Sequence, residues 1–152
     1  KNSYRGNIYI NFSDSRNGLD DIDIFVIKST DGVFTWGDVQ RVNDDPINNH
    51  KQQFMSWMSV DPVSGAVNII FYDRRNHNDV STDVYLARST DGGATYKNYK
   101  ISEISFIPKK FNFFGDYINI SSYNDVVACI WQRMDGGVLT ILSTVTDFKT
   151  FK

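Results

Sequence analysis

The sequence predicts an all-β fold built from repeats, a β-propeller, and three observations lead to that prediction. Of the 18 acidic residues, 17 are Asp, which favours turns, and only Glu103 is Glu, which favours helix interiors. Aromatic residues make up 14% of the chain, and aromatic side chains suit pleated strands. The third observation is an internal repeat, which is the signature of an architecture that uses one unit several times.

The repeat is clearest in a polar motif that occurs twice. Ser29–Trp36 reads Ser-Thr-Asp-Gly-Val-Phe-Thr-Trp, and Ser89–Tyr96 reads Ser-Thr-Asp-Gly-Gly-Ala-Thr-Tyr. Upstream of them, Asp14–Asn17 matches Asp73–Asn76 at nearly the same spacing. The repeat therefore extends well beyond the polar motif.

A third, partial copy lies in the last part of the chain. Val126–Trp131 follows the similar run Ala66–Phe71 at the spacing that separates the two polar motifs. We therefore expect one β domain over the whole chain, with repeats at approximately 1–53, 54–113 and 114–152.

Each repeat is expected to hold four short strands, because turn residues separate the apolar runs. In the second repeat the predicted strands are 54–60, 67–72, 83–88 and 96–101. The run 67–72 is apolar almost throughout, which is typical of a sheet covered on both faces.

Four antiparallel strands covered by neighbouring repeats describe a propeller blade, and a two-sheet sandwich is the alternative. About 60 residues for each blade gives this chain of 152 residues about two and a half blades, whereas closed propellers have roughly four to eight. We expect part of a ring, completed by blades of the same or another chain.

The repeated polar motif has a mechanical interpretation. The Asp caps a turn by accepting backbone N–H groups, the Gly adopts a conformation that is costly for other residues, and the aromatic ring packs under the hairpin. The expected structural residues are Ser29, Asp31, Gly32, Thr35 and Trp36 in the first copy and Ser89, Asp91, Gly92, Thr95 and Tyr96 in the second.

On these two motifs, and on the run Ile69–Arg75, the sequence resembles the sialidase-like propellers, whose blades carry this "Asp box" or BNR repeat. It looks most like secreted bacterial proteins named exo-α-sialidases or Asp-box repeat proteins. The resemblance implies a secreted or surface location, a glycan partner and, if the protein is an enzyme, hydrolysis of glycosidic bonds. It also implies that the boxes are structural and lie opposite the active site.

Candidate functional residues come from the loops on the other face. A retaining sialidase needs arginines to bind the sugar carboxylate, a Tyr nucleophile, a Glu beside that Tyr, and an Asp acid/base. Arg74 and Arg75 are the candidate substrate-binding residues, and Asp116 and Tyr117 are the candidate catalytic residues. Arg75 has a counterpart in Arg16, which favours a structural ion pair instead.

This set is incomplete for a sialidase. Glu103 is the only candidate for the Glu, and the Arg-Ile-Pro motif that opens the family's catalytic domain is absent from this chain. Two alternatives to an enzyme therefore stay open. The propeller could be a non-catalytic module that binds a glycan or a protein, or this segment could only close the ring while the site lies on other blades.

Composition argues against several other classes. The formal net charge is −2 and the 16 Lys and Arg residues are scattered, so a nucleic-acid partner is not expected. No apolar run approaches the roughly 20 residues that cross a bilayer. One Cys and two His residues are too few for a structural zinc site, and no cofactor is expected. Calcium is left open, because Asp14–Asp21 is rich in oxygen ligands but has Arg16 where the second ligand should stand.

Overall fold

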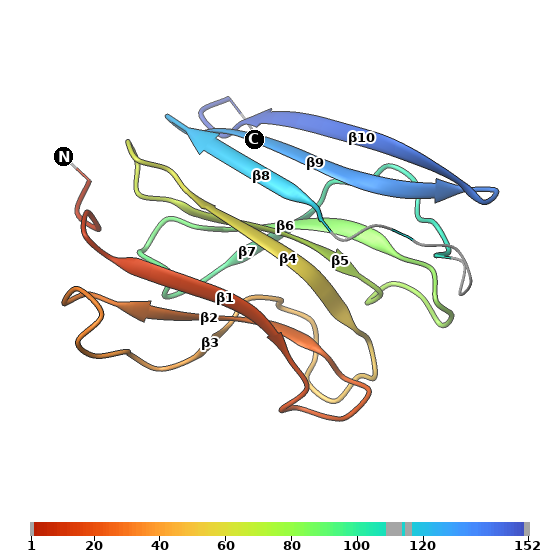
Figure 1. Cartoon of the computed structure of the whole chain (residues 1–152), viewed down its shortest axis with the longest axis horizontal. Helices are drawn as coiled ribbons and strands as arrows, with labels where there is room; N and C mark the ends of the chain where they lie inside the picture. The colour runs from red at the N-terminus through yellow and green to blue at the C-terminus, as the bar shows by residue number, and fades with distance from the viewer. Residues whose placement is uncertain (1, 109–113, 115–116, 151–152) are drawn as a thin grey trace.

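The structure, a computed structural model, describes residues 2–108, 114 and 117–150 (Figure 1). These residues form ten strands and no helix, so the all-β prediction is confirmed for them. The strands are β1 (Ile8–Asp14), β2 (Asp23–Ser29), β3 (Gln40–Arg41), β4 (Gln53–Val60), β5 (Val67–Asp73), β6 (Asp83–Ser89), β7 (Lys97–Lys100), β8 (Asn119–Tyr123), β9 (Val126–Asp135) and β10 (Val138–Asp147). The four strands predicted for the second repeat match β4 to β7 to within one residue at each end.

The strands form three antiparallel sheets that follow one another along the chain. The first sheet has the order β1-β2-β3, the middle sheet β4-β5-β6-β7, and the last sheet β8-β9-β10. Four strands in one sheet, as expected for each repeat, are therefore found only in the middle sheet of the described chain. By the spacing of the repeat, β1 and β9 both correspond to β5. Within the described residues, the first sheet therefore has no counterpart of β4 and the last sheet has no counterpart of β7.

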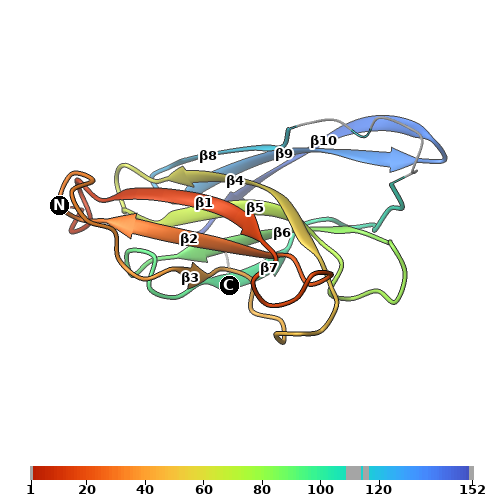
Figure 2. The same cartoon turned by 60° about the horizontal axis from the view of Figure 1, so that its bottom comes forward.

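The three sheets are layered, with the middle sheet between the other two (Figures 1 and 2). Strand β4 lies between β1 and β8 (Figure 1). One apolar core fills the junction of the first and middle sheets, around Ile24, Val26 and Ile69. The other fills the junction of the middle and last sheets, around Tyr72 and Trp131.

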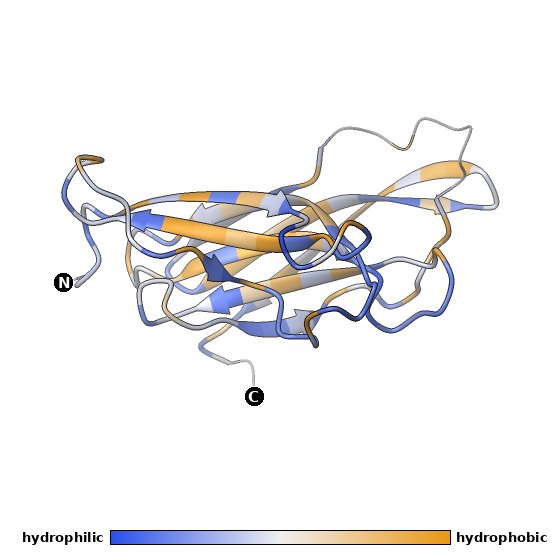
Figure 3. Cartoon of the chain, turned by 90° about the horizontal axis from the view of Figure 1, so that it is seen from below, coloured by the Kyte–Doolittle hydropathy of each residue, from blue (hydrophilic) through white to orange (hydrophobic). Residues whose placement is uncertain are grey.

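Strands β5 and β6 are buried along their whole length, because both faces of the middle sheet are covered. This explains why their sequences are nearly continuous apolar runs, whereas a half-exposed strand alternates. Figure 3 shows the same contrast, with apolar colour along the strands and polar colour in many of the loops that join them.

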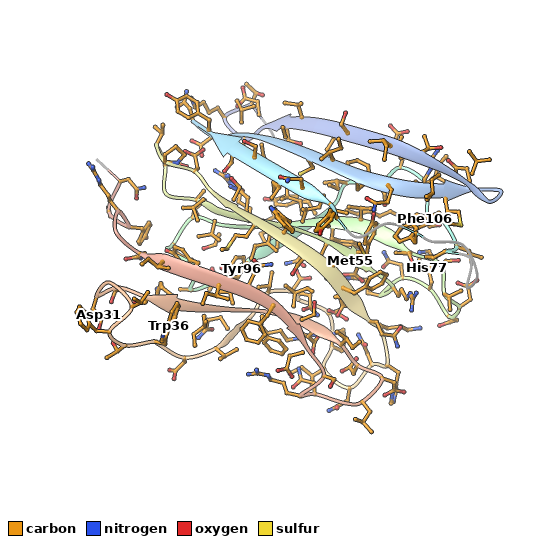
Figure 4. All side chains as sticks on the ribbon, in the orientation of Figure 1. Asp31, Trp36, Met55, His77, Tyr96 and Phe106 are labelled. Atoms are coloured by element: carbon orange, nitrogen blue, oxygen red, sulfur yellow. The ribbon has the colours of Figure 1, made fainter. Side chains whose placement is uncertain are left out.

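The connections between strands fall at two opposite ends of the sheets. Asp31 and Trp36 lie at one end, whereas His77 and Phe106 lie at the other (Figure 4). We call these the turn end and the loop end. Among the described residues, no helix is long and apolar enough to cross a membrane.

Candidate functional site

At the turn end, Asp31 organises the connection between β2 and β3. Its Oδ1 accepts hydrogen bonds from the Ser29 hydroxyl and the Thr35 backbone N–H, both at 2.9 Å, and its Oδ2 accepts one from the Thr35 hydroxyl at 2.6 Å. The bonds from Thr35 and Ser29 stabilise the charged form and lower the pKa of Asp31 to about 2. Asp31 is therefore a fixed anion that holds a turn.

Asp91 makes the same pattern between β6 and β7. Its Oδ1 accepts the Ser89 hydroxyl and the backbone N–H of Thr95, and its Oδ2 accepts the Thr95 hydroxyl. Burial favours the neutral acid, but these bonds outweigh burial and lower the pKa of Asp91 to about 2. Gly92 has a φ of +74°, the left-handed conformation that glycine adopts at little cost.

At the loop end, β1 and its counterpart β5 each end in an Asp-x-Arg ion pair. Arg16 contacts Asp14 at 2.9 Å on the surface, and Arg75 contacts Asp73 at 2.7 Å in the interior. Both pairs confirm the structural ion pairs predicted from the matched positions. Arg75 also pairs with Asp44 and lies 3.7 Å from Asp45, so three carboxylates surround its guanidinium.

A buried polar network extends from this pair into the junction of the first and middle sheets. Gln53 Nε2 donates to Asp73 Oδ1 at 3.2 Å, and Asn43 Nδ2 lies 2.8 Å from Gln53 Oε1. Asn43 also accepts the backbone N–H of Ile24, while Arg41 pairs with buried Asp23. Each of these polar groups is desolvated and paired. The network therefore holds the first and middle sheets together and is not an open binding surface.

Arg74 differs from its neighbour Arg75. Its Nη1 donates to Gln52 Oε1 at 3.1 Å, and its guanidinium carbon lies 5.0 Å from the centre of the Phe54 ring. Among the described residues, no carboxylate pairs with Arg74. Burial lowers its pKa, although an arginine stays charged at physiological pH. Arg74 is therefore a half-buried cation held in place by neutral groups, with charge available for an anion.

Tyr117 lies just before β8 and is exposed, with 70% of its surface accessible. Its ring contacts Trp57 of β4 edge to face, at 6.1 Å between ring centres. The two rings thus join the middle and last sheets in an exposed aromatic pair. Asp116, the other predicted catalytic residue, lies outside the described residues.

The remaining candidates do not gather around Tyr117. Glu103, which follows β7, lines a hollow with Trp131 and Arg133 of β9. Burial raises the pKa of the Cys129 thiol to about 12, so it stays protonated and is no nucleophile. Within the described ranges, no group of three or more His, Cys, Asp or Glu side chains is arranged to hold a metal ion.

Sequence reasoning missed several residues of this site. Gln52 and Phe54 hold Arg74, and Trp57 contacts Tyr117; all three belong to β4 or directly precede it. The repeat predicts a strand here, but it does not show which side chains touch. Asp147 was also missed. It accepts the Lys149 backbone N–H at 2.9 Å and caps a turn after β10, as the other two Asp turns follow β2 and β6.

Comparison with known proteins finds similarity in structure only. No protein-family model matches the sequence, and no curated protein matches it. A sialidase described as Hadza microbial sialidase Hz136 superposes with a TM-score of 0.67 at 16% identity, over 99% of this chain and 34% of the sialidase.

Two further structures superpose less closely. One is the family 117 glycoside hydrolase Zg3597 of Zobellia galactanivorans, with a TM-score of 0.54 at 13% identity, over 94% of this chain and 49% of that one. The other is the α-L-arabinofuranosidase arb93a of Fusarium graminearum, with a TM-score of 0.51 at 11% identity, over 97% of this chain and 56% of that one. At these identities the likeness is one of fold. The chain spans about a third to a little over half of the structures it matches, and those structures are enzymes that act on carbohydrates.

Proposed function

We propose that the three sheets are consecutive blades of a sialidase-like propeller that acts on glycans outside the cell. In this proposal the turns of Asp31 and Asp91 are Asp boxes on the lower face, and the loop end is the upper, functional face. The layering of three successive antiparallel sheets supports the proposal, as does the fold likeness to carbohydrate-acting enzymes. Further blades of the same or another chain would cover the two outer sheets.

The observation that carries the functional part is the contrast between Arg74 and Arg75. Arg75 is bound to Asp73 and Asp44, whereas Arg74 has neutral partners and no carboxylate among the described residues. A guanidinium held in this way matches a carboxylate on a ligand, such as that of a sialic acid. We assign substrate binding to Arg74 and a structural role to Arg75.

The test is hydrolysis of a fluorogenic sialoside by the full-length protein. Arg74→Ala should lower kcat/KM about 10- to 100-fold, since a hydrogen-bonded charge pair contributes roughly 1.5–3 kcal/mol. Tyr117→Phe should abolish turnover and leave binding intact, because it removes the nucleophilic oxygen alone. Arg16→Ala is the matched control and should have the activity of the unmodified protein. Unchanged activity of the Arg74 variant would contradict the assignment.

A second function, glycan binding without hydrolysis, is favoured by one observation. The contact made by Tyr117 is with the Trp57 ring, and Glu103, the only Glu of the chain, lies in a separate hollow with Trp131. A glycan array that shows Arg74-dependent binding, with no turnover of any glycoside, would establish this function in place of the enzymatic one.

A further inference from the structure

Strand β4 contains an irregularity in the half that is nearer to the loop end. Its pairing with β5 shifts between Phe54, which lies opposite Tyr72, and Trp57, which lies opposite Ile70. Two residues of β4 thus stand against one residue of β5, which is the arrangement of a β-bulge. Met55, the first of the two (Figure 4), has a φ of +51°, a left-handed conformation that is costly for residues other than glycine. Bulges and strained residues of this kind are concentrated beside functional sites, where they re-aim side chains.

The bulge decides which face of β4 carries Trp57. Phe54 and Trp57 are three positions apart, so a regular strand would point them to opposite faces of the sheet. Their partners Tyr72 and Ile70 are two positions apart, and both belong to the core between the middle and last sheets. Because cross-strand partners share a face, the bulge places Phe54 and Trp57 together on the side of the last sheet.

The cation of the proposed site lies on the same side of β4. The Arg74 guanidinium is 5.0 Å from the centre of the Phe54 ring, and it bonds to Gln52, two positions before Phe54. Further along the strand, Trp57 packs edge to face against Tyr117 at 6.1 Å between ring centres. The order along β4 is therefore a cation, the Phe54 ring and an aromatic pair, all at the junction of two sheets.

The aromatic pair is accessible although its two rings touch. Trp57 is 42% exposed and Tyr117 is 70% exposed, whereas Ile70, opposite Trp57, is fully buried. The pair lies between the middle and last sheets, so blades packed on the outer faces of the first and last sheets would leave it uncovered. An accessible aromatic surface beside a positive charge fits a ligand that has both an apolar face and a negative charge.

We propose that Trp57 and Tyr117 form a second subsite, on which a neutral sugar ring stacks when Arg74 binds the carboxylate of an adjoining acidic sugar. This inference rests on the proposed function, because it takes Arg74 as the anion-binding residue. The C–H groups on one face of a pyranose carry partial positive charge and pack on the negative face of an aromatic ring.

The spacing of the two subsites indicates the class of ligand. Phe54, which lies under the Arg74 guanidinium, and Trp57 are separated by two residues of β5, about 7 Å along the strand. This separation is comparable with the step from one sugar ring to the next in an oligosaccharide. The ligand is therefore an acidic sugar linked to a neutral sugar, rather than a free acidic monosaccharide.

The test compares two ligands that share the acidic sugar, by calorimetry with the full-length protein. One is the methyl α-thioglycoside of sialic acid, and the other is sialic acid joined to galactose through sulfur, so that binding is measured without turnover. The disaccharide should bind about tenfold more tightly, and Trp57→Ala should remove that difference. The Kd of the monosaccharide should stay within about twofold in Trp57→Ala, and Trp57→Phe, which keeps an aromatic ring, should retain most of the preference.

Two further variants serve as controls. Trp36→Ala is the matched control, because Trp36 is 38% exposed but lies at the turn end, and it should change the Kd of neither ligand. Arg74→Ala should weaken both ligands equally, about 10- to 100-fold, since both carry the carboxylate.

The outcomes separate this inference from the one on which it rests. Equal affinity for the two ligands, with an effect of Arg74→Ala and none of Trp57→Ala, would overturn the second subsite and leave the role of Arg74 intact. Equal weakening of both ligands by Trp57→Ala would also overturn it, because Trp57 would then shape the Arg74 site itself. No measurable binding of either ligand would contradict the assignment of Arg74 and, with it, the second subsite.

Discussion

The first and second repeats carry the same loop motif, yet the structure uses it differently. The side chains of Arg16 and Asp14 are 41% and 35% exposed, whereas those of Arg75 and Asp73 are 12% and 0% exposed. The middle sheet is covered on both faces and the first sheet on one. The contribution of such an ion pair to stability is therefore set by what packs over it rather than by its sequence.

The strands show the same difference. Ile69 of β5 is fully buried, while Ile10, its match in β1, is 48% exposed. The middle and last sheets differ in the same way, because Ile70 of β5 is fully buried and Ile130, its match in β9, is 45% exposed. The outer faces of the first and last sheets are thus built from the residue types that the middle sheet buries, which is what supports the proposal of further blades.

Arg75→Ala gives the largest effect that we expect, a loss of about 3–5 kcal/mol in the free energy of unfolding. The substitution leaves buried Asp73 without its cation, and breaking a buried pair from one side is strongly destabilising. Urea denaturation of the variant and the unmodified protein measures the difference.

The matched control is Arg16→Ala in the first repeat. It removes an exposed ion pair and should cost no more than about 0.5 kcal/mol. Equal losses in the two variants would show that burial does not separate the two copies of the loop.

The matched isoleucines of β5 and β1 test the same difference in the strands, through the variants Ile69→Ala and Ile10→Ala. Ile69→Ala removes fully buried methyl groups and should cost about 3 kcal/mol. Ile10→Ala should cost less than about 1 kcal/mol in the 152-residue chain, because half of that side chain is exposed.

In a full-length propeller a preceding blade would cover Ile10, and the losses of Ile69→Ala and Ile10→Ala should become equal. Persistent inequality there would contradict the propeller proposal.

Gly92→Ala and Gly32→Ala compare the two Asp turns. Both glycines have a φ of +74°, so alanine at either position should cost about 1 kcal/mol. A Cβ at Gly92 would lie 2.5 Å from the Tyr4 ring, whereas one at Gly32 meets nothing within 4 Å. Because that crowding adds the strain of overpacking, the Gly92 variant should lose about 2 kcal/mol in the same urea assay. A loss equal to that of the Gly32 variant would show that the Tyr4 ring moves aside freely.

The sequence was sufficient to predict the features that the repeats share, such as strands and turns. It was not sufficient to predict the side-chain contacts that differ from one repeat to the next. Spacing alone located the strands of the middle sheet and the Asp14 and Asp73 ion pairs, because turn chemistry and apolar runs are local properties. It favoured an ion pair for Arg75, because Arg75 matches Arg16, but it did not show that Asp44 is a second partner, because Asp44 is far upstream and meets Arg75 only through packing of the sheets.

Asp91→Asn, in the second of the two Asp turns, should have a small effect that depends on pH. The folded protein lowers the pKa of Asp91 from 3.8 to about 2, so the charged form stabilises the fold above pH 3.8, and this contribution is lost as the pH falls towards 2. Asn keeps one acceptor and loses the charged bond to the Thr95 hydroxyl, so the variant should lose about 1 kcal/mol at neutral pH. Urea unfolding at several pH values should show this difference shrinking to near zero at about pH 2. A difference that stays constant across that range would mean that the geometry of the turn, and not the charge of Asp91, stabilises the hairpin.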